Sequence, residues 1–600
     1  MAETEHPSGT ARKGTMRRML GLLGPYKWTV GFCCLLGVLL NLAELVKPYI
    51  MEIAIDRFLT PFAGMGDQYA ALAGENWFTG TLIGLGVSYF LMTLLSAASS
   101  YAQSMLISGV CQRILHNLRM KLSDHIHRMK LVDLDHMGSG RLLTRSTNDV
   151  EALDEFYGGV LMNLFKDVFL LIGIVAVMLR MNWQLALVGF ATLPLIALVT
   201  LGCKRALHRN FVKMKMWIGR INGFIAESLS GIRVIQAFNR EEEKYDELYE
   251  MDREYRKTTM FQVFVNSFMR PMTEVINSLG IALILIAGFK LAGAEVAPLE
   301  VGVLVAFNTY IKKFFEPIND LAENYNTIQS SVVSADRVFS LLEDDGNLED
   351  LDAPGHSGEM KGSIEFRDVW FAYEGENWVL RGLSFRCEAG DKIAFVGATG
   401  AGKTTIISLL SRFYVPQKGE ILVDGVPLND WQLEPLRRQI AVVLQDVFLF
   451  VGTIADNVRI HAPISDEAVR DALEKSCALD FVDGLQGGLH HMVAERGATF
   501  STGERQLISF ARAIAHDPKI LVLDEATANI DSATEAVIQK SIRQISEGRT
   551  AVFIAHRLST IRNADCIYYM EKGVLTEQGT HEELMAKQGK YYALVSEQAG

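Results

Sequence analysis

The feature that most constrains the fold is a pair of long apolar stretches between Gly158 and Gly202, separated by only a few residues. Each stretch can cross the hydrocarbon core of a bilayer, which requires roughly 20 apolar residues. A large soluble protein with buried helices is the alternative, and so closely spaced a pair argues against it. In all, six segments are candidate spans: Val30–Ile55, Gly80–Val110, Gly158–Leu179, Gln184–Gly202, Val275–Leu291 and Val301–Leu321.

The basic residues predict how these segments are oriented. Residues 60–80, after the first span, contain no Lys or Arg, whereas residues 113–145 and 204–257 are rich in both. Because basic loops stay on the cytoplasmic side, we expect a multi-pass protein with both termini in the cytoplasm. The absence of organellar targeting features favours a bacterial inner membrane. The stretch RRMLGLLGPYKW before the first span is typical of a short interfacial helix.

Ionisable residues inside predicted spans are costly and often functional. Glu44 and Lys47 lie near one face of the first span, and Asn308, Lys312 and Glu316 recur every four residues on the last. Two interpretations stay open. These side chains line a water-filled pathway, or they pair with one another inside the membrane or lie close to its interface.

The second half of the chain carries a phosphate-binding motif. KIAFVGATGAGKTTIISLLSRF has the pattern of a strand, a Gly-rich loop and a helix, and it matches G-x-x-x-x-G-K-[ST] at every fixed position. In such a loop the backbone N–H groups surround the β-phosphate, Lys403 reaches the β- and γ-phosphates, and the Thr404 hydroxyl ligates Mg²⁺. The candidate ATP-contacting residues are Gly397, Ala398, Thr399, Gly400, Ala401, Gly402, Lys403, Thr404 and Thr405.

A second apolar strand, ILVLDEAT, ends in two acids. Ligands gather at the carboxyl ends of strands in open α/β sheets, so Asp524 is expected to support Mg²⁺ through water. Glu525 is placed to polarise the attacking water. A third strand, TAVFIA, ends in His556, which we expect to contact the γ-phosphate.

These motifs make the soluble half resemble the nucleotide-binding domain of ATP-binding cassette (ABC) proteins, and residues 17–597 together resemble an ABC exporter half-transporter. The resemblance implies an α-helical six-span transmembrane domain plus an α/β P-loop ATP-binding cassette domain. The expected boundaries are residues 1–28 for the cytoplasmic N-terminus with its interfacial helix, 29–330 for the transmembrane domain, 331–362 for a linker and 363–600 for the nucleotide-binding domain.

The resemblance also implies roles for individual residues. Tyr373 would stack on adenine, and Gln445, in VVLQDVFLF, would be the Q-loop glutamine that senses Mg²⁺. Ser501 and Gly503 occupy the signature turn, FSTGERQ, which holds the γ-phosphate of ATP bound by a partner chain. AERG (with Glu495 and Arg496) resembles the X-loop and ANID (ending in Asp531) the D-loop, while LDHMGSGRLLTRSTNDVEAL and ESLSGIRVIQAFNREEEK resemble the two coupling loops.

The signature turn departs from the family's Leu-Ser-Gly-Gly-Gln at three positions, Phe500, Thr502 and Glu504. Thr502 places a side chain where backbone must approach phosphate, and Glu504 adds a negative charge near the nucleotide. An intact catalytic set beside an altered signature is similar to one chain of the family's asymmetric exporters. We therefore predict a heterodimer with a second half-transporter chain, and a homodimer with a tolerated variant signature is the alternative.

The resulting hypothesis is an ATP-driven, alternating-access exporter of an amphiphilic, multidrug-type substrate, with ATP and Mg²⁺ as cofactors. A homodimeric lipid or peptide exporter, an ATP-gated channel or regulator, and a soluble ABC ATPase are the alternatives. The expected partners are the second chain, the lipid bilayer and the substrate. The net charge of −12 argues against a dedicated nucleic-acid binder, so no nucleic acid is expected as a partner.

Overall fold

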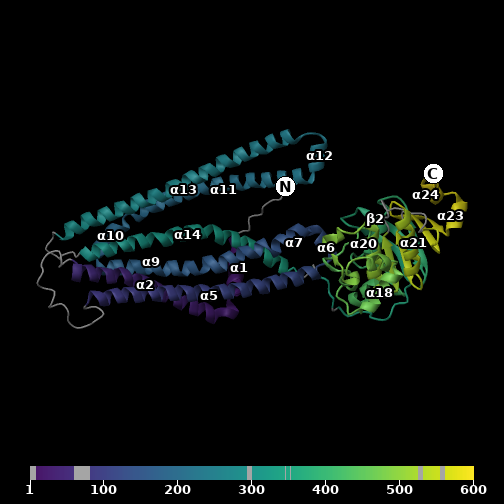
Figure 1. The fold of residues 1–600 in the computed structure, drawn as a ribbon, viewed down its shortest axis with the longest axis horizontal. Coiled ribbons are helices and arrows are strands. Elements are labelled where there is room, and N and C mark those ends of the chain that lie inside the picture. Colours follow the sequence, from purple (N-terminus) through teal and green to yellow (C-terminus); the bar gives the residue numbers. More distant parts are fainter. Residues whose placement is uncertain are drawn as a thin grey trace. The chain divides into compact units, whose positions relative to one another are not determined.

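The structure is a computed structural model that describes residues 9–59, 81–292, 301–344, 346, 348–351, 353–524, 532–554 and 561–599 (Figure 1). The chain divides into two compact units. One is helical and comprises Met1–Asp124 and Gly140–Glu343. The other comprises His125–Ser139 and Asp344–Gly600.

Long helices dominate the first unit. Among the described residues, five helical segments are long and apolar enough to cross a membrane: Gly24–Ala54, Leu82–Arg128, Ser139–Met181, Trp183–Ser230 and Glu241–Ala287. The sixth predicted span lies in α14, whose apolar stretch is interrupted by Lys312, Lys313 and Glu316. In chain order the elements are α1 (Gly9–Gly21), η1 (Gly24–Tyr26), α2 (Lys27–Ala54), η2 (Ile55–Leu59), α5 (Leu82–Arg128), α7 (Ser139–Ser146), α8 (Asn148–Asp154), η4 (Glu155–Val160), α9 (Leu161–Met181), α10 (Trp183–Phe190), α11 (Leu193–Ser230), α12 (Ile232–Ala237), α13 (Glu241–Ala292) and α14 (Val301–Leu342).

Small residues let these helices approach closely, as is usual inside membranes. A Cβ on Gly173 of α9 would lie 2.4 Å from Leu45 of α2. α2, α9 and α14 pack against one another around a core that includes Phe307 and Tyr310 of α14, both fully buried. α14 also continues to Leu342, beyond the boundary predicted at residue 330.

α11 and α13 form a separate pair within the helical unit. They pack against each other along their length and diverge from α9 and α14 toward α12, which joins them at the tip (Figure 1). α12 has no buried residue, and Val234 and Phe238 at this tip are 61 % and 72 % exposed. The tip thus presents apolar side chains that the described part of this chain leaves uncovered.

The second unit is an α/β domain built on two main sheets. A six-stranded sheet has the order β12-β11-β3-β10-β9-β6, in which only β12 is antiparallel to its neighbour, and an antiparallel sheet has the order β2-β1-β4-β5. The strands are β1 (Ile364–Ala372), β2 (Trp378–Cys387), β3 (Lys392–Val396), β4 (Lys418–Val423), β5 (Val426–Pro427), β6 (Ile440–Val443), β7 (Gly452–Thr453), β8 (Met492–Val493), β9 (Ile520–Asp524), β10 (Thr550–Ile554), β11 (Cys566–Glu571) and β12 (Val574–Gly579).

Helices cover both faces of the parallel sheet. Along β9, Leu521 and Leu523 join the core on one face, whereas Ile520 and Val522 join the core on the other. This alternation explains why the strand is apolar at every position until Asp524. The helical elements of this unit are α6 (Leu131–Met137), α15 (Lys403–Leu410), η6 (Leu428–Asp430), α16 (Leu433–Gln439), α17 (Ile454–Arg459), α18 (Asp466–Lys475), α19 (Leu479–Asp483), η7 (Gly488–His490), η8 (Glu495–Gly497), α20 (Thr502–Ala515), α21 (Ser532–Ile545), α23 (His581–Lys587) and α24 (Lys590–Ala599).

Candidate nucleotide-binding site

The Gly-rich loop joins β3 to α15, as the sequence pattern predicts. Ala398, Thr399 and Gly400 form its exposed crest, while Ala401 is buried beneath it. Gly402 is the N-cap of α15, with φ +98°. The first N–H groups of a helix lack partners within the helix and attract anions. The open crest and the helix N-terminus together form a cradle suited to phosphate.

Two glycines of this loop are required by close packing as well as by backbone conformation. Gly397 has φ +147°, and a Cβ there would lie 2.1 Å from the carbonyl oxygen of Met570. A Cβ on Gly402 would lie 2.8 Å from Leu380. By contrast, a Cβ on Gly400 meets open space, although its φ of +82° still favours glycine. Gly397 and Gly402 therefore fix the loop to the sheets, and Gly400 leaves the crest bare.

Lys403 lies buried under the loop and is only 5 % exposed. Its ammonium donates to the carbonyl oxygens of Gly397 (2.7 Å) and Ala398 (2.9 Å). Burial lowers the pKa of Lys403, and the nearby carboxylate of Asp524 partly opposes this effect. The structure thus brings Lys403 and Asp524 together, although they are far apart in the sequence.

Tyr373 follows β1 and lies beside α15. Its hydroxyl is 3.2 Å from the hydroxyl of Thr405, which is buried. Its ring makes edge contacts with Phe371 and Tyr414, while 44 % of the residue stays exposed. An aromatic ring held on one side and open on the other is suited to stacking on a planar base.

The residues predicted to hold Mg²⁺ lie at the carboxyl ends of the parallel strands. Asp524 is the last residue of β9, Gln445 follows β6 and is exposed, and the exposed Thr404 lies in the first turn of α15. A hydroxyl, an amide and a buried carboxylate are hard oxygen ligands of the kind that Mg²⁺ prefers, so the donor set fits this ion. Glu525, Asp531 and His556 lie outside the described residues.

The signature turn begins α20. Ser501 is the N-cap: its hydroxyl accepts from the backbone N–H of Glu504 (3.2 Å), and the Glu504 carboxylate accepts from the backbone N–H of Ser501 (2.7 Å). This reciprocal pair is a capping box. The structure therefore assigns Glu504 a role different from the predicted approach of its carboxylate to the nucleotide. The spacing Ser-x-x-Glu could have indicated this capping role of Glu504 from the sequence.

The structure also shows where the side chains of the turn's other residues lie. Phe500 is buried against Phe481 and His491, so its larger ring fills the core of the cassette. Gly503 is buried, and a Cβ there would lie 2.3 Å from the Thr534 methyl carbon of α21. Thr502, by contrast, is exposed, and its hydroxyl accepts from the Arg505 guanidinium (3.3 Å). Thr502 is the altered position whose side chain stays at the surface of the turn.

The first coupling loop supplies contacts that sequence reasoning missed. Its helix α6 lies in the cassette unit, where the Tyr414 hydroxyl donates to the Asp135 carboxylate (2.5 Å). The Lys130 ammonium donates to the carbonyl oxygen of Gly346 (2.7 Å). Tyr414 also contacts Tyr373 edge-on. One aromatic pair thus links the first coupling loop to the residue predicted to stack on adenine.

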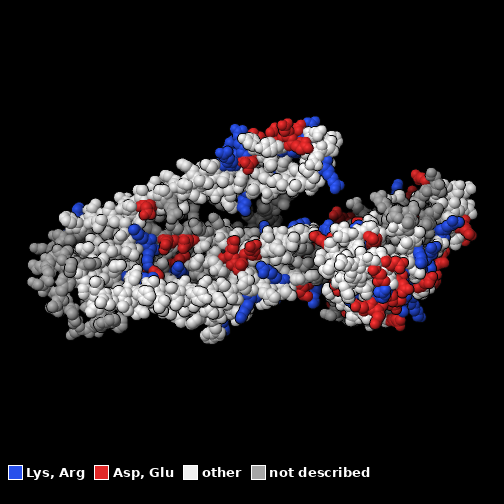
Figure 2. Space-filling model, viewed as in Figure 1, with Lys and Arg blue, Asp and Glu red and all other residues white. Residues whose placement is uncertain are grey.

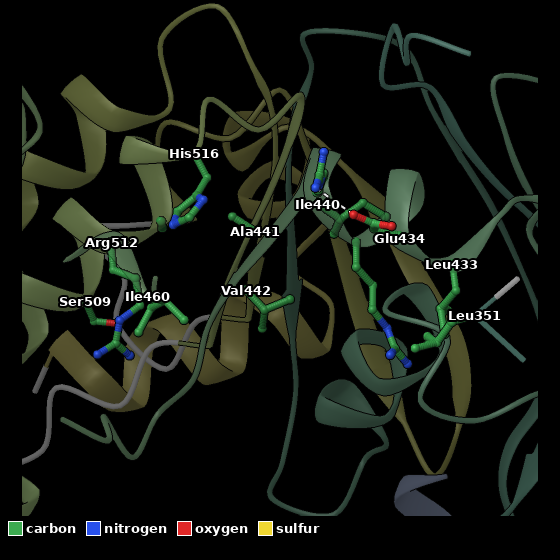
Figure 3. Close-up of a pocket in the computed structure, with 13 residues that line it drawn as sticks. Leu351, Leu433, Glu434, Ile440, Ala441, Val442, Ile460, Ser509, Arg512 and His516 are labelled. Atoms are coloured by element: carbon green, nitrogen blue, oxygen red, sulfur yellow. Dashed lines mark ion pairs between the residues drawn. The ribbon is translucent and has the colours of Figure 1, made fainter. Parts of the chain in front are cut away.

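A cavity of about 490 Å³ opens beside β6, between α16 on one side and α20 on the other (Figure 3). In the sheet, β10 and β9 separate β6 from β3, which precedes the phosphate loop. The cavity's arginines are already bound: Arg437 to Glu349, Arg438 to Glu434, and Arg512 to the backbone carbonyls of Phe448 and Asn457. Because these cations are satisfied within the protein, the cavity is no match for a nucleotide.

Comparisons with known proteins agree with this geometry. The sequence matches the ABC transporter transmembrane region over residues 30–318 and the ABC transporter family over residues 380–528. It is 38% identical over 513 residues to the "Probable multidrug resistance ABC transporter ATP-binding/permease protein YheH" of Bacillus subtilis (strain 168), which covers 85% of this chain and 76% of that protein. It is 32% identical over 593 residues to an "ATP-dependent lipid A-core flippase" of Syntrophus aciditrophicus (strain SB), covering 98% and 95%.

The fold is likewise similar to a solved bacterial Atm1-family ABC exporter with ATP bound, with a TM-score of 0.75, 26% identity and 98% of both chains covered. The matched transmembrane region excludes the soluble ABC ATPase that the sequence left open. The expected fold class, a helical transmembrane domain with an ABC cassette, is confirmed.

The general expectations about activity, membrane location and assembly are also confirmed. The cassette binds ATP and couples its hydrolysis to transport, and the protein is a multi-pass membrane transporter that acts as a dimer. These conclusions rest on a family match that includes both halves of the chain. The chain therefore belongs to the ABC transporters and is an exporter half-transporter, which carries one transmembrane region and one ATP-hydrolysing cassette in a single polypeptide.

Proposed function

We propose that this chain is one subunit of a heterodimeric exporter that moves an amphiphilic, multidrug-type substrate outward across a bacterial inner membrane. The observation that carries the heterodimer is the exposed side chain of Thr502, at the position of the signature turn where a partner's γ-phosphate would lie. A glycine there leaves only backbone, whereas threonine adds bulk and restricts φ. In this proposal the chain's own nucleotide faces a standard signature on the partner, and its altered turn covers the partner's weaker site.

The chain's own residues would hold ATP in the cradle of the phosphate loop. On binding, the Lys403 ammonium would exchange the neutral carbonyl oxygens of Gly397 and Ala398 for charged phosphate oxygens, which are stronger acceptors. Tyr373 would stack on the adenine. Thr404, Gln445 and, through water, Asp524 would hold Mg²⁺, which supplies charge neutralisation between the phosphates. Glu525 and His556 would then act on the attacking water and the γ-phosphate.

The uncovered tip of the α11–α13 pair supports the need for a second chain. Val234 and Phe238 at this tip expose most of their surface, although apolar surface in water is costly. We infer that α12 docks on the cassette of the partner chain, while α6 contacts the chain's own cassette. If the α12 of each chain docks on the cassette of the other chain, closure of the cassettes around the nucleotide would move the spans of both chains.

A homodimer is the second candidate, and one observation favours it. The Glu504 carboxylate is bound to the Ser501 N–H, so it is held at the helix cap. The charge at this position is therefore less disruptive than the sequence suggests, and Thr502 alone distinguishes the turn. In a homodimer two identical sites of this kind would both hydrolyse ATP.

The proposed substrate class draws on the relatives of this chain. The relatives include a protein named for multidrug resistance and one named for flipping lipid A-core, so apolar and lipid-like molecules are both proposed as substrates of this architecture.

The membrane topology is proposed from the basic residues. The segments rich in Lys and Arg include the ends of α5, α11 and α13, whereas the loop at residues 60–80 contains neither residue. Because basic segments favour the cytoplasmic side, the proposed topology has both termini in the cytoplasm.

The test is the ATPase activity and mass of the purified chain in lipid nanodiscs, alone and with a co-expressed second half-transporter. We expect slow turnover alone, rapid turnover in a 1:1 complex, and loss of it with Glu525→Gln in this chain. Rapid turnover by a homodimer would contradict the heterodimer but not the exporter. ATP-dependent accumulation of a fluorescent amphiphile in inverted vesicles tests transport, and passive flux that only requires bound ATP would instead identify a channel.

A further inference from the structure

Charged side chains gather on one face of the helical unit, among surfaces that carry few charges elsewhere along the spans (Figure 2). Three charged residues of α14 are exposed, namely Lys312, Glu316 and Asp320. Glu44 of α2 and Lys313 of α14 are partly exposed, with about a quarter of each side chain accessible. Ionisable groups inside a membrane avoid lipid and face the bundle interior or water. This face is therefore expected to line the substrate pathway between the two chains.

One part of the face is internally paired. The Glu44 carboxylate binds the Lys313 ammonium (2.5 Å) and also the ammonium of Lys47. Lys47 additionally donates to the Ser96 hydroxyl of α5 (3.1 Å). Of the two interpretations of Glu44 and Lys47 that the sequence left open, the structure agrees with pairing inside the helical unit. Because Glu44 already binds both lysines, they are poorly available to an anionic ligand.

The neighbouring part, on α9, carries a carboxylate that is not paired in this way. Asp167 is 3 % exposed, and its Oδ2 has no hydrogen-bond partner among the described residues. It interacts electrostatically with Asp320 and Glu316, and with Lys166 beside it. A buried carboxylate without a donor is costly, so this atom is a candidate contact for a ligand.

A second buried acceptor lies next to it. Asn41 of α2 is 3 % exposed and donates its amide N–H to the carbonyl oxygen of Lys166 (2.9 Å), which leaves its Oδ1 without a partner in the described structure. Asn41, Asp167 and Glu316 lie about 20, 21 and 22 Å from the ends that α2, α9 and α14 share at one end of the unit, at 1.5 Å per residue. Three helices thus present oxygen acceptors at one depth.

We propose that Asp167, with Asn41 and Glu316, forms a subsite for the cationic head of an amphiphilic substrate, such as an alkylammonium ion. Acceptors without donors require a ligand that donates hydrogen bonds, and an ammonium group has three N–H donors. The charged groups that act on the Asp167 carboxylate are the carboxylates of Asp320 and Glu316 and the ammonium group of Lys166. Counting Asp167 itself, three carboxylates thus face one ammonium group. This excess of carboxylates favours a positively charged ligand. The names of the chain's relatives do not indicate whether its substrate is charged. The inference rests on the proposed exporter function and adds a substrate class to it.

The experiment uses the complete transporter in nanodiscs of zwitterionic phosphatidylcholine, so that lipid charge does not concentrate the ligand. Three single-chain probes of equal tail length are compared below their micellar concentrations: dodecylammonium, dodecanoate and dodecanol. For each probe, the concentration that half-maximally stimulates ATP hydrolysis is measured. Equilibrium binding without nucleotide is measured by calorimetry. We expect dodecylammonium to act at a concentration at least tenfold below that of dodecanoate.

Asp167→Asn then removes the charge and keeps the shape. We expect a tenfold or greater loss of dodecylammonium affinity in both measurements, an unchanged or improved response to dodecanoate, and recovery of most of the affinity in Asp167→Glu. Glu250→Gln, on the exposed part of α13, is the matched control and should leave all three probes unaffected. Asp167→Asn relieves the repulsion between the buried Asp167 carboxylate and the exposed carboxylates of Glu316 and Asp320, so it should not prevent folding.

Equal affinity of the wild type for the cation and the anion, or a cation response that Asp167→Asn leaves intact, would overturn the subsite. A variant that slows basal hydrolysis without changing the ranking of the probes would show a structural role and would also overturn it. The exporter function is judged separately by Lys403→Ala, which should abolish hydrolysis with or without any probe. If hydrolysis depends on Lys403 while the probes are not distinguished, the subsite fails and the exporter remains.

Discussion

The backbone N–H of Ser501 donates a 2.7 Å hydrogen bond to the carboxylate of Glu504, and the Ser501 hydroxyl accepts from the N–H of Glu504 in return. The altered signature turn is thus a closed helix cap. The cap leaves the hydroxyl proton of Ser501 free to donate to a phosphate, since the hydroxyl acts only as an acceptor within this pair. An acidic residue can therefore stand at this position and stabilise the turn.

This relationship predicts how Glu504 variants behave. Glu504→Ala should lose about 1 kcal/mol of local stability, because the Ser501 N–H loses a charge-assisted acceptor. Glu504→Gln keeps an oxygen acceptor and should lose less than half as much. Hydrogen exchange of the Ser501 amide measures both, since about 1.4 kcal/mol corresponds to a tenfold change in protection. Glu474→Ala, at an exposed position of α18, is the control. Undiminished protection in Glu504→Ala would contradict the cap.

Gly503→Ala should destabilise the cassette by about 1–3 kcal/mol, because the added carbon would lie 2.3 Å from the Thr534 methyl carbon and overpack α20 against α21. Thr534→Ser removes that methyl group and keeps the hydroxyl. Thermal unfolding of the full-length protein should show that Thr534→Ser restores most of the loss. If the double variant regains stability but not ATPase activity, Gly503 also serves close approach of the partner's phosphate. No loss in the single variant would contradict the packing argument.

The two ends of the phosphate loop should respond differently to alanine. Gly397→Ala places a carbon 2.1 Å from the backbone oxygen of Met570, which cannot rotate away, and should prevent the loop from forming. Gly400→Ala meets open space and should cost only about 1–2 kcal/mol for its positive φ. ATP affinity and the unfolding temperature, measured on both variants, check this order. Equal effects of the two variants would mean that Met570 is not the limiting contact.

Tyr414→Phe should uncouple hydrolysis from transport, because it removes the hydrogen bond to Asp135 of the first coupling loop and keeps the aromatic packing. Asp135→Asn keeps an oxygen acceptor and should retain most of the coupling. The ratio of substrate transported to ATP hydrolysed, measured in proteoliposomes, is expected to fall severalfold only in the first variant. Tyr592→Phe, at a partly exposed position of α24, is the control. A normal ratio in Tyr414→Phe would show that this contact carries no coupling.

Much of the fold could be predicted from the sequence, because its dominant patterns are local. Uninterrupted apolar runs of the length of a membrane span have few alternatives to transmembrane helices. The phosphate loop requires glycines at fixed spacing between a strand and a helix, so its position in the fold follows from the motif. Pairwise contacts were predicted less well: Glu44 of α2 binds Lys313 of α14 as well as Lys47, and the sequence analysis did not single out Lys313.

The sequence by itself determined the six apolar segments, the α/β cassette and the residues of the nucleotide loop, since each depends on neighbours within about twenty positions of the chain. Only the tertiary structure decided which long-range contacts form. It paired Asp135 with Tyr414 across 279 positions and placed Asp167 and Asn41 at one depth with unmatched acceptors. The physical reason is that a side chain's hydrogen-bond partners depend on how helices and strands pack, which local periodicity does not encode.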